Sequence, residues 1–290
     1  MEQCDLRSIE LDMADTISSL YEKYGYGDSA HAFNSLYIWA KDMDIKAYIS
    51  PELYAAKLVS KGENTWFSPV GCEEEKKSFI ADRLREKKLV FRYMTKEDAK
   101  FLNENFPGAF EIEPAINDSE YVYDRDTIEN LPGKGLSRKR RYVKQLKKEH
   151  TFEFRKISPE TLPDIRYILG IWRRNKDYDP DCNDQGALEA MLSSYSDMNI
   201  DGVVIYMDNA PCSVAAGYYL SGDTVDACLQ KSAINIYGLQ YFVRQVFSSS
   251  FPEQVKFYNY EEDLGIEGLR QAKEFMHPFS MVDMYTGKQI

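Results

Sequence analysis

Two stretches of this chain share one pattern, in which a short aromatic strand runs through an acidic turn into a helix. The first begins with strand spacing over Leu89–Met94, and an acidic pair and a helical apolar period follow. The second has strand spacing over Val255–Tyr260, the acidic segment Glu261–Asp263, and helical spacing after Gly265. Because the pattern recurs once in each half of a 290-residue chain, it predicts two copies of one fold.

Helices and short strands alternate along both halves, which indicates a mixed architecture. The strands expected from period-two spacing and flanking turn residues are 45–49, 54–59 and 64–67 in the first half, and 202–207, 213–220 and 224–230 in the second. This order predicts an α+β chain with domains at residues 1–135 and 136–290, each with a mixed, mostly antiparallel sheet. Since no low-complexity linker separates the two, we expect them to pack against each other.

The most basic segment spans residues 134–148, within a chain whose formal net charge is −11. Leu136, Val143 and Leu146 fall on one face of the helix expected there, so most of the charge points outward. Two interpretations stay open: a solvated connecting helix, or a surface that binds the phosphates of a polyanion. The candidate contacts for such a polyanion are Lys134, Arg138, Lys139 and Arg141.

Several classes of protein are disfavoured by composition and spacing. The five cysteines form no Cys-x-x-Cys pair, and the three histidines show no metal spacing, so we predict no metal site. The acidic segment Asp177–Asp184 lacks the order of an EF-hand, which favours a solvated loop over a calcium site. The first residues lack a signal-peptide pattern, and the apolar runs are far short of a membrane span. We therefore expect a cytoplasmic protein without a transmembrane segment.

Three motifs along the chain carry a resemblance to a known family. The longest is Asn259–Lys273, which contains Glu-Asp-Leu-Gly-Ile-Glu-Gly-Leu-Arg-Gln-Ala-Lys. The second is Leu131–Lys134 with basic residues after it, although Gly135 departs from the usual bulky or basic residue, and the third is the aromatic segment Ala32–Trp39. Together they resemble the C-terminal domain family of the phosphatidylglycerol lysyltransferases, which is related to the Fem aminoacyl-tRNA transferases. The resemblance implies two tandem GNAT-like (acyl-CoA N-acyltransferase) domains.

The resemblance also implies an activity. Characterised members move an aminoacyl group from a charged tRNA to a lipid, so the chain is expected to transfer an aminoacyl group from aminoacyl-tRNA to a small or lipid acceptor. Under this hypothesis tRNA is the polyanion of the basic segment. Two alternatives stay open: a coenzyme A-dependent N-acyltransferase and a non-catalytic binding protein. The segment Gln230–Gly238 disfavours coenzyme A, because it has one glycine where GNAT enzymes place a Gly-rich pyrophosphate turn.

Aminoacyl transfer from an ester needs a group that takes a proton from the acceptor and a donor that stabilises the oxyanion. We expect the groove at the end of the strand over residues 255–260, where polar residues gather. The catalytic candidates are Asn259, Glu261 and Asp263, and the substrate-binding candidates are Arg270, Lys273, Gln230 and Asn235. The sequence does not single out the base, and in an alternative interpretation Asp263 only caps the following helix.

Overall fold

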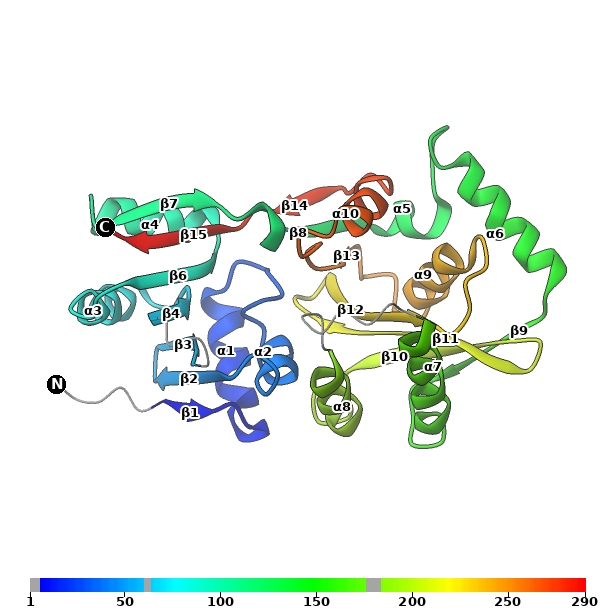
Figure 1. The fold of residues 1–290 in the computed structure, drawn as a ribbon, viewed down its shortest axis with the longest axis horizontal. Coiled ribbons are helices and arrows are strands. Elements are labelled where there is room, and N and C mark those ends of the chain that lie inside the picture. Colours follow the sequence, from blue (N-terminus) through cyan, green and yellow to red (C-terminus); the bar gives the residue numbers. More distant parts are fainter. Residues whose placement is uncertain (1–5, 60–63, 176–183) are drawn as a thin grey trace.

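The computed structural model describes residues 6–59, 64–175 and 184–290, and the strands in this part of the chain form two separate sheets (Figure 1). The first sheet has the order β1 (Arg7–Ser8), β2 (Ile45–Ser50), β3 (Leu53–Leu58), β4 (Asn64–Phe67), β6 (Leu89–Met94), β15 (Tyr285–Gln289) and β7 (Phe110–Pro114), with β5 (Val70–Gly71) paired to β3. The second has the order β9 (Phe152–Lys156), β10 (Asp201–Met207), β11 (Ala210–Tyr219), β12 (Thr224–Ser232), β13 (Phe257–Asn259), β8 (Glu120–Asp124) and β14 (Ser280–Val282).

The two strand orders match position by position. In each sheet the fourth strand pairs in parallel with the fifth, β4 with β6 and β12 with β13, while the other neighbours along the two orders pair antiparallel. The shared sequence pattern marks this fifth strand and the helix after it, β6 with α4 (Lys96–Asn105) and β13 with α10 (Glu267–Glu274). The prediction of two copies with mixed, mostly antiparallel sheets is therefore confirmed.

The sixth strand of each sheet comes from the opposite half of the chain. In Figure 1 the red strand β15 lies between β6 and β7, whereas β8 lies in the second sheet between β13 and β14. The side chain of Gln289 strengthens this exchange, because it accepts a hydrogen bond from the Leu89 amide (3.1 Å) and donates one to the Leu84 carbonyl (3.0 Å). Strand pairing thus crosses residue 135 in both directions, and a domain boundary at that residue stays a prediction.

Helices cover both faces of each sheet and create three hydrophobic layers. The helices are α1 (Ala14–Tyr24), α2 (Phe33–Trp39), α3 (Glu73–Arg83), α4, α5 (Arg125–Asn130), α6 (Ser137–Glu149), α7 (Leu162–Asn175), α8 (Gln185–Ser194), α9 (Leu239–Ser249) and α10. Successive residues of β3 point to opposite layers, since Tyr54 lies in one core cluster and Leu53 and Ala55 in another. Across the described residues, no helix combines the length and apolar character needed to cross a lipid bilayer.

The middle layer belongs to both halves, and it holds them together. One core cluster contains Leu36 of α2 in the first half and Leu188 and Met191 of α8 in the second. Polar contacts cross the same boundary: Asn34 Nδ2 donates to the Met198 carbonyl at 2.8 Å. Because apolar burial of this extent excludes water, the halves are fixed against each other around any site between them.

The basic segment forms α6 as expected, with its apolar face on α9. Leu136, Val143 and Leu146 are buried in the second-half core, and the charged side chains lie on the outer side. The turn before the helix is tied down by Arg140, whose Nη1 donates to the carbonyls of Leu131 and Gly133.

Candidate functional site

The parallel strands β12 and β13 separate at a defined point, and this separation creates the candidate site. The pairing of the two strands ends at Asp226 opposite Asn259. Beyond this point β12 continues to Ser232, whereas the backbone after β13 turns away through residues 260–263, which we call the elbow. Glu261 makes the turn with a φ of +57°. The opening leads to a cavity of about 510 Å³ between the two halves, which we call the central cavity.

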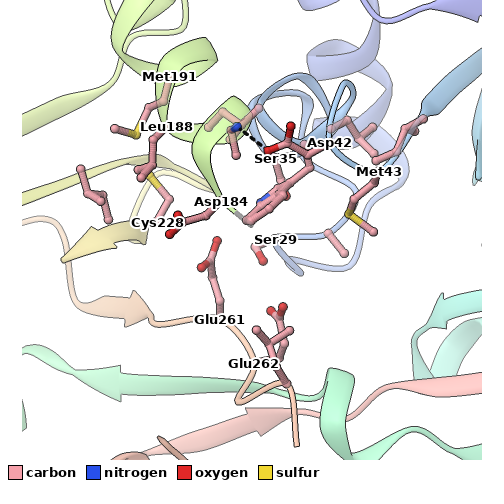
Figure 2. A pocket seen from close by; sticks show the side chains of 18 of the residues that line it. Ser29, Ser35, Asp42, Met43, Asp184, Leu188, Met191, Cys228, Glu261 and Glu262 are labelled. Carbon is pink, nitrogen blue, oxygen red and sulfur yellow. Dashed lines mark hydrogen bonds between the residues drawn. The ribbon is translucent and has the colours of Figure 1, made fainter. Parts of the chain in front are cut away.

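The central cavity combines apolar walls with acidic side chains. Its apolar lining comes from both halves and includes Leu36, Trp39, Met43, Leu188 and Met191. Its acidic lining residues are Asp42, Asp184, Glu261 and Glu262. Figure 2 shows Glu261 and Glu262 reaching from the elbow into the cavity, while Asp42 is held by the Ala187 amide at 2.8 Å. Such a lining suits a ligand with an apolar part and a cationic group.

Lys273 holds the elbow in place from below. Its Nζ donates to the carbonyls of Tyr260 (2.6 Å), Glu261 (3.0 Å) and Glu262 (2.5 Å). The side chain is 6% exposed, and burial lowers the pKa of its ammonium group. Because three carbonyls converge on one ammonium group, the backbone of the elbow is fixed, and with it the direction of its carboxyl groups.

Asp263 and Arg270, which the sequence places in the site, form an ion pair with each other at the end of the elbow. Asp263 is fully buried and accepts hydrogen bonds from Arg270 Nε and Nη2 (2.8 Å each), the Tyr121 hydroxyl (2.6 Å) and the Gly265 amide (2.8 Å). Burial alone raises its pKa, but these donors outweigh burial and lower the pKa to about 2. The alternative that Asp263 caps α10 is wrong, because Ile266 occupies the cap position.

Asn259 is also fully buried, and it links the elbow to a network that joins the two halves. Its Oδ1 accepts from the Glu261 amide at 2.8 Å, and its Nδ2 donates to Glu120. Glu120 in turn accepts from the hydroxyl (2.8 Å) and amide of Ser29 in the first half. Burial and the neighbouring Asp28 raise the pKa of Glu120 to about 8. Asn259 therefore positions the elbow and does not line the cavity.

Several carboxyl groups around the central cavity have raised pKa values. Burial, with the charges of Asp226 and Glu262, raises the pKa of Glu261 well above its usual range. Burial likewise raises the pKa of Glu262, and that of Asp226 to about 7. The carboxyl of Asp226 and the hydroxyl of Tyr218 lie close enough to shift each other's pKa, but among the described residues neither makes a hydrogen bond of normal geometry. Asp226 can therefore exchange a proton near neutral pH, and the raised pKa values of Glu261 and Glu262 mark both as candidates for acid–base chemistry.

A second cavity of about 740 Å³, which we call the basic cavity, is lined by other residues that the sequence predicts for the site. Gln230, Asn235, Arg138 and Lys139 line it, and Lys231 of β12 lines both cavities. The structure thus brings Glu261 and Lys273 to one cavity and places Gln230 and Asn235 in the other. The remaining two basic candidates are exposed and line neither cavity; Lys134 precedes α6 and Arg141 lies on it.

Some residues that line the central cavity are not predicted from the sequence. Tyr218 and Ser29 lie in segments whose pattern predicts only buried strand or loop, so no local signal marks them. Glu262 lies beside Glu261 in the acidic elbow, and this position next to a candidate residue is what could have identified it from the sequence. Asp184 closes the acidic segment 177–184, for which the sequence predicts a solvated loop; residues 176–183 lie outside the described residues.

Comparison with known proteins gives a consistent family and fold. The model of the family described as "Phosphatidylglycerol lysyltransferase, C-terminal" matches residues 21–286. Among curated proteins, none matches the chain. A conserved protein of unknown function from Bacteroides thetaiotaomicron has a TM-score of 0.88 at 21% identity, covering 99% of this chain and 100% of that one. L-PGS from Bacillus licheniformis has a TM-score of 0.67 at 12% identity, covering 98% of this chain and 93% of that one. FemX has a TM-score of 0.66 at 9% identity, covering 96% of each chain. The predicted tandem GNAT-like fold is thereby confirmed.

Proposed function

We propose that this chain, which belongs to the phosphatidylglycerol lysyltransferase C-terminal family and is acyltransferase-like, transfers an aminoacyl group from aminoacyl-tRNA. The acceptor of that group would bind in the central cavity. One observation carries the proposal: the diverging ends of β12 and β13 open onto a cavity whose acidic groups include Glu261, a carboxyl with a raised pKa. Divergence of this kind gives a linear acyl donor a path to the middle of the sheet. A proton acceptor then lies where that path ends.

The proposed chemistry uses residues already in place. The acceptor amine or hydroxyl attacks the ester carbonyl and gives its proton to Glu261, and that proton then passes to the ribose oxygen that leaves. The C–O bond of the ester breaks as the new C–N or C–O bond forms. Burial raises the pKa of Tyr218, so its hydroxyl stays protonated and is our candidate donor to the oxyanion. The ammonium group of the aminoacyl donor would favour the charged form of Glu262, whose pKa burial raises in the free protein, and would pair with it.

The tRNA body is assigned to the outer face of α6. Eight cationic side chains lie within residues 134–148, in a chain of net charge −11, and all except Lys139 are exposed. A local patch of this kind supplies phosphate contacts although the chain as a whole is acidic. Lys231 lines both cavities, which supports a path from RNA held near α6 to the elbow for the aminoacylated 3′ end.

A transfer assay tests the chemistry. The protein is incubated with tRNA carrying radiolabelled amino acids, and transfer is measured to phosphatidylglycerol vesicles and to a panel of small amines; acetyl-coenzyme A replaces the tRNA in a parallel arm. Glu261→Gln should lower the transfer rate by about 10²–10⁴-fold, whereas Glu274→Gln, an exposed control on α10, should leave it unchanged. Equal rates for Glu261→Gln and the wild type would show that Glu261 is not the base. Transfer from acetyl-coenzyme A but not from aminoacyl-tRNA would show that coenzyme A, and not tRNA, carries the acyl group.

A binding assay tests the RNA surface separately. Substituting Arg138, Lys139 and Arg141 together by Ala should weaken tRNA binding and flatten its log–log salt dependence by about 2–3, at roughly 0.7–0.9 per phosphate contact. Lys96→Ala with Lys100→Ala, on α4 of the first half, serves as the control for a general loss of positive charge. If the triple variant keeps the wild-type affinity and slope, α6 is a solvated connector.

A further inference from the structure

The basic cavity has a composition that the proposed acyl-transfer step leaves unexplained. Its described lining contains three cationic side chains, Arg138, Lys139 and Lys231, and no carboxylate. The same lining carries five aromatic side chains: Tyr142, Trp172, Tyr237, Tyr241 and Phe275. Cations interleaved with aromatic rings around a cavity of about 740 Å³ are typical of sites for single nucleotides, in which rings stack on bases and cations pair with phosphates.

Tyr237 is the most exposed of these rings and is held at a fixed angle. It is 81% exposed, yet its ring lies against Tyr142, with ring centroids 5.3 Å apart and an interplanar angle of 32°. Tyr142 is held in turn by Arg138, whose Nε donates to the Tyr142 hydroxyl at 2.5 Å and whose guanidinium lies 5.3 Å from that ring. Since one face of Tyr237 rests on Tyr142 and most of the ring is open, an aromatic surface is presented to solvent at the cavity.

The cationic groups lie beside this surface. Lys139 Nζ lies 5.0 Å from the centre of the Tyr241 ring and 4.8 Å from that of Phe275, so its stem is packed and its charge is directed along the cavity wall. Gly238, next to Tyr237, has a φ of +94°, and a Cβ there would lie 2.8 Å from the Tyr142 carbonyl carbon and oxygen. The turn that carries Tyr237 therefore lies directly against the backbone of α6.

We propose that the basic cavity binds the terminal nucleoside and phosphate of the acyl donor, with the base stacked on Tyr237 and the phosphate beside Lys139 and Arg138. The proposal rests on the proposed function for the direction of the donor, since Lys231 lines both this cavity and the central cavity, to which the proposed function assigns the acyl group. The 3′ end of tRNA and the nucleotide part of coenzyme A share this chemistry. The experiment has to distinguish them.

Three probes are titrated by fluorescence anisotropy or competition: an acceptor-stem RNA hairpin with an intact 3′ end, the same hairpin without its terminal nucleotide, and coenzyme A. Tyr237→Ala should weaken binding of the intact hairpin by about 5- to 150-fold, the range for one stacked base. It should change binding of the shortened hairpin little, and Tyr237→Phe should retain wild-type affinity. Tyr167→Ala, an exposed tyrosine on α7 outside the cavity, is the matched control. Thermal unfolding verifies that each variant is folded.

The outcomes separate the two proposals. If the intact hairpin binds through α6 but is insensitive to Tyr237→Ala, the stacking site is refuted while tRNA stays the donor. If coenzyme A alone binds and loses affinity in Tyr237→Ala, the nucleotide site holds and the tRNA donor is refuted. Equal losses for both hairpins would show that Tyr237 contacts an internal nucleotide and would overturn the terminal assignment. If none of the three probes binds to the wild type, the site is overturned.

Discussion

Replacing Asp263 by Asn should lower the free energy of unfolding by about 2–4 kcal/mol at pH 6. The lower figure follows from charge alone: a pKa lowered from 3.8 to about 2 is worth about 2.4 kcal/mol at 1.36 kcal/mol per pKa unit. The carboxylate is fully buried and Arg270 is 26% exposed, so solvent screening reduces this value only modestly. The higher figure adds the donors that would face an amide NH₂ group in place of a carboxylate oxygen.

The pH dependence has a definite sign. Because the folded-state pKa of Asp263 lies below its unfolded value, its contribution is present above about pH 4 and is lost as the pH falls toward 2. The stability gap between the wild type and Asp263→Asn should therefore be smaller at pH 3 than at pH 6, by about 1 kcal/mol.

Urea unfolding followed by intrinsic fluorescence measures both quantities. Arg270→Gln should show a similar loss, and the double variant should lose less than the sum of the two single losses because they remove one interaction. Glu113→Gln is the control; it breaks an ion pair with Lys288 in which both side chains are about half exposed, and should cost less than about 1 kcal/mol. A loss below about 0.5 kcal/mol for Asp263→Asn at pH 6 would refute the claim that this pair anchors the elbow. Full stability with lost transfer would return Asp263 to the catalytic residues.

Three further predictions concern other parts of the structure. Lys273→Met should cost about 3 kcal/mol or more in urea unfolding, because three carbonyls lose one buried ammonium donor, and a loss below about 1 kcal/mol would contradict this clamp. Wild-type stability should fall as the pH rises from about 5 to 8, since a folded-state pKa raised to about 8 favours protonated Glu120 in the fold; Glu120→Gln should flatten this slope, and an unchanged slope would exclude it as the source. Gly238→Ala should lower the melting temperature through a φ of +94° and contact with Tyr142, whereas Gly268→Ala on α10, with open space around it, should not; equal effects would contradict the argument.

Local patterns predicted the two copies of the fold but not how they exchange strands. The acidic turn after an aromatic strand marks β6 and β13 because residue spacing and helix-start chemistry are properties of the segment itself. The partner of a strand is not such a property. The short segments β8 (Glu-Tyr-Val-Tyr-Asp) and β15 (Tyr-Thr-Gly-Lys-Gln) carry no pattern that selects one sheet over the other, so the sequence leaves their assignment open.

The lining of the central cavity was predicted in part for a similar reason. Glu261 follows β13 and Lys273 lies on α10, and both line the central cavity, because the polar turn after the strand leads directly into that helix. The spacing between Asp263 and Arg270 does not reveal that the two bind each other, since the intervening turn brings residues seven apart into contact. Tyr218 lies within an apolar strand, where a single polar atom gives no pattern.

The exchanged strand also determines when the first half of the protein completes its sheet during synthesis. β6 and β7 leave the ribosome early, but β15, which pairs with both, is made about 190 residues after β6, or roughly 10–40 s later at typical elongation rates. During that interval the nascent chain holds two strands whose edges lack their partner, and open edges of this kind recruit other chains. Translation speed over the second half and chaperone capture of the first should therefore affect the yield of native protein, even though neither changes the stability of the finished fold.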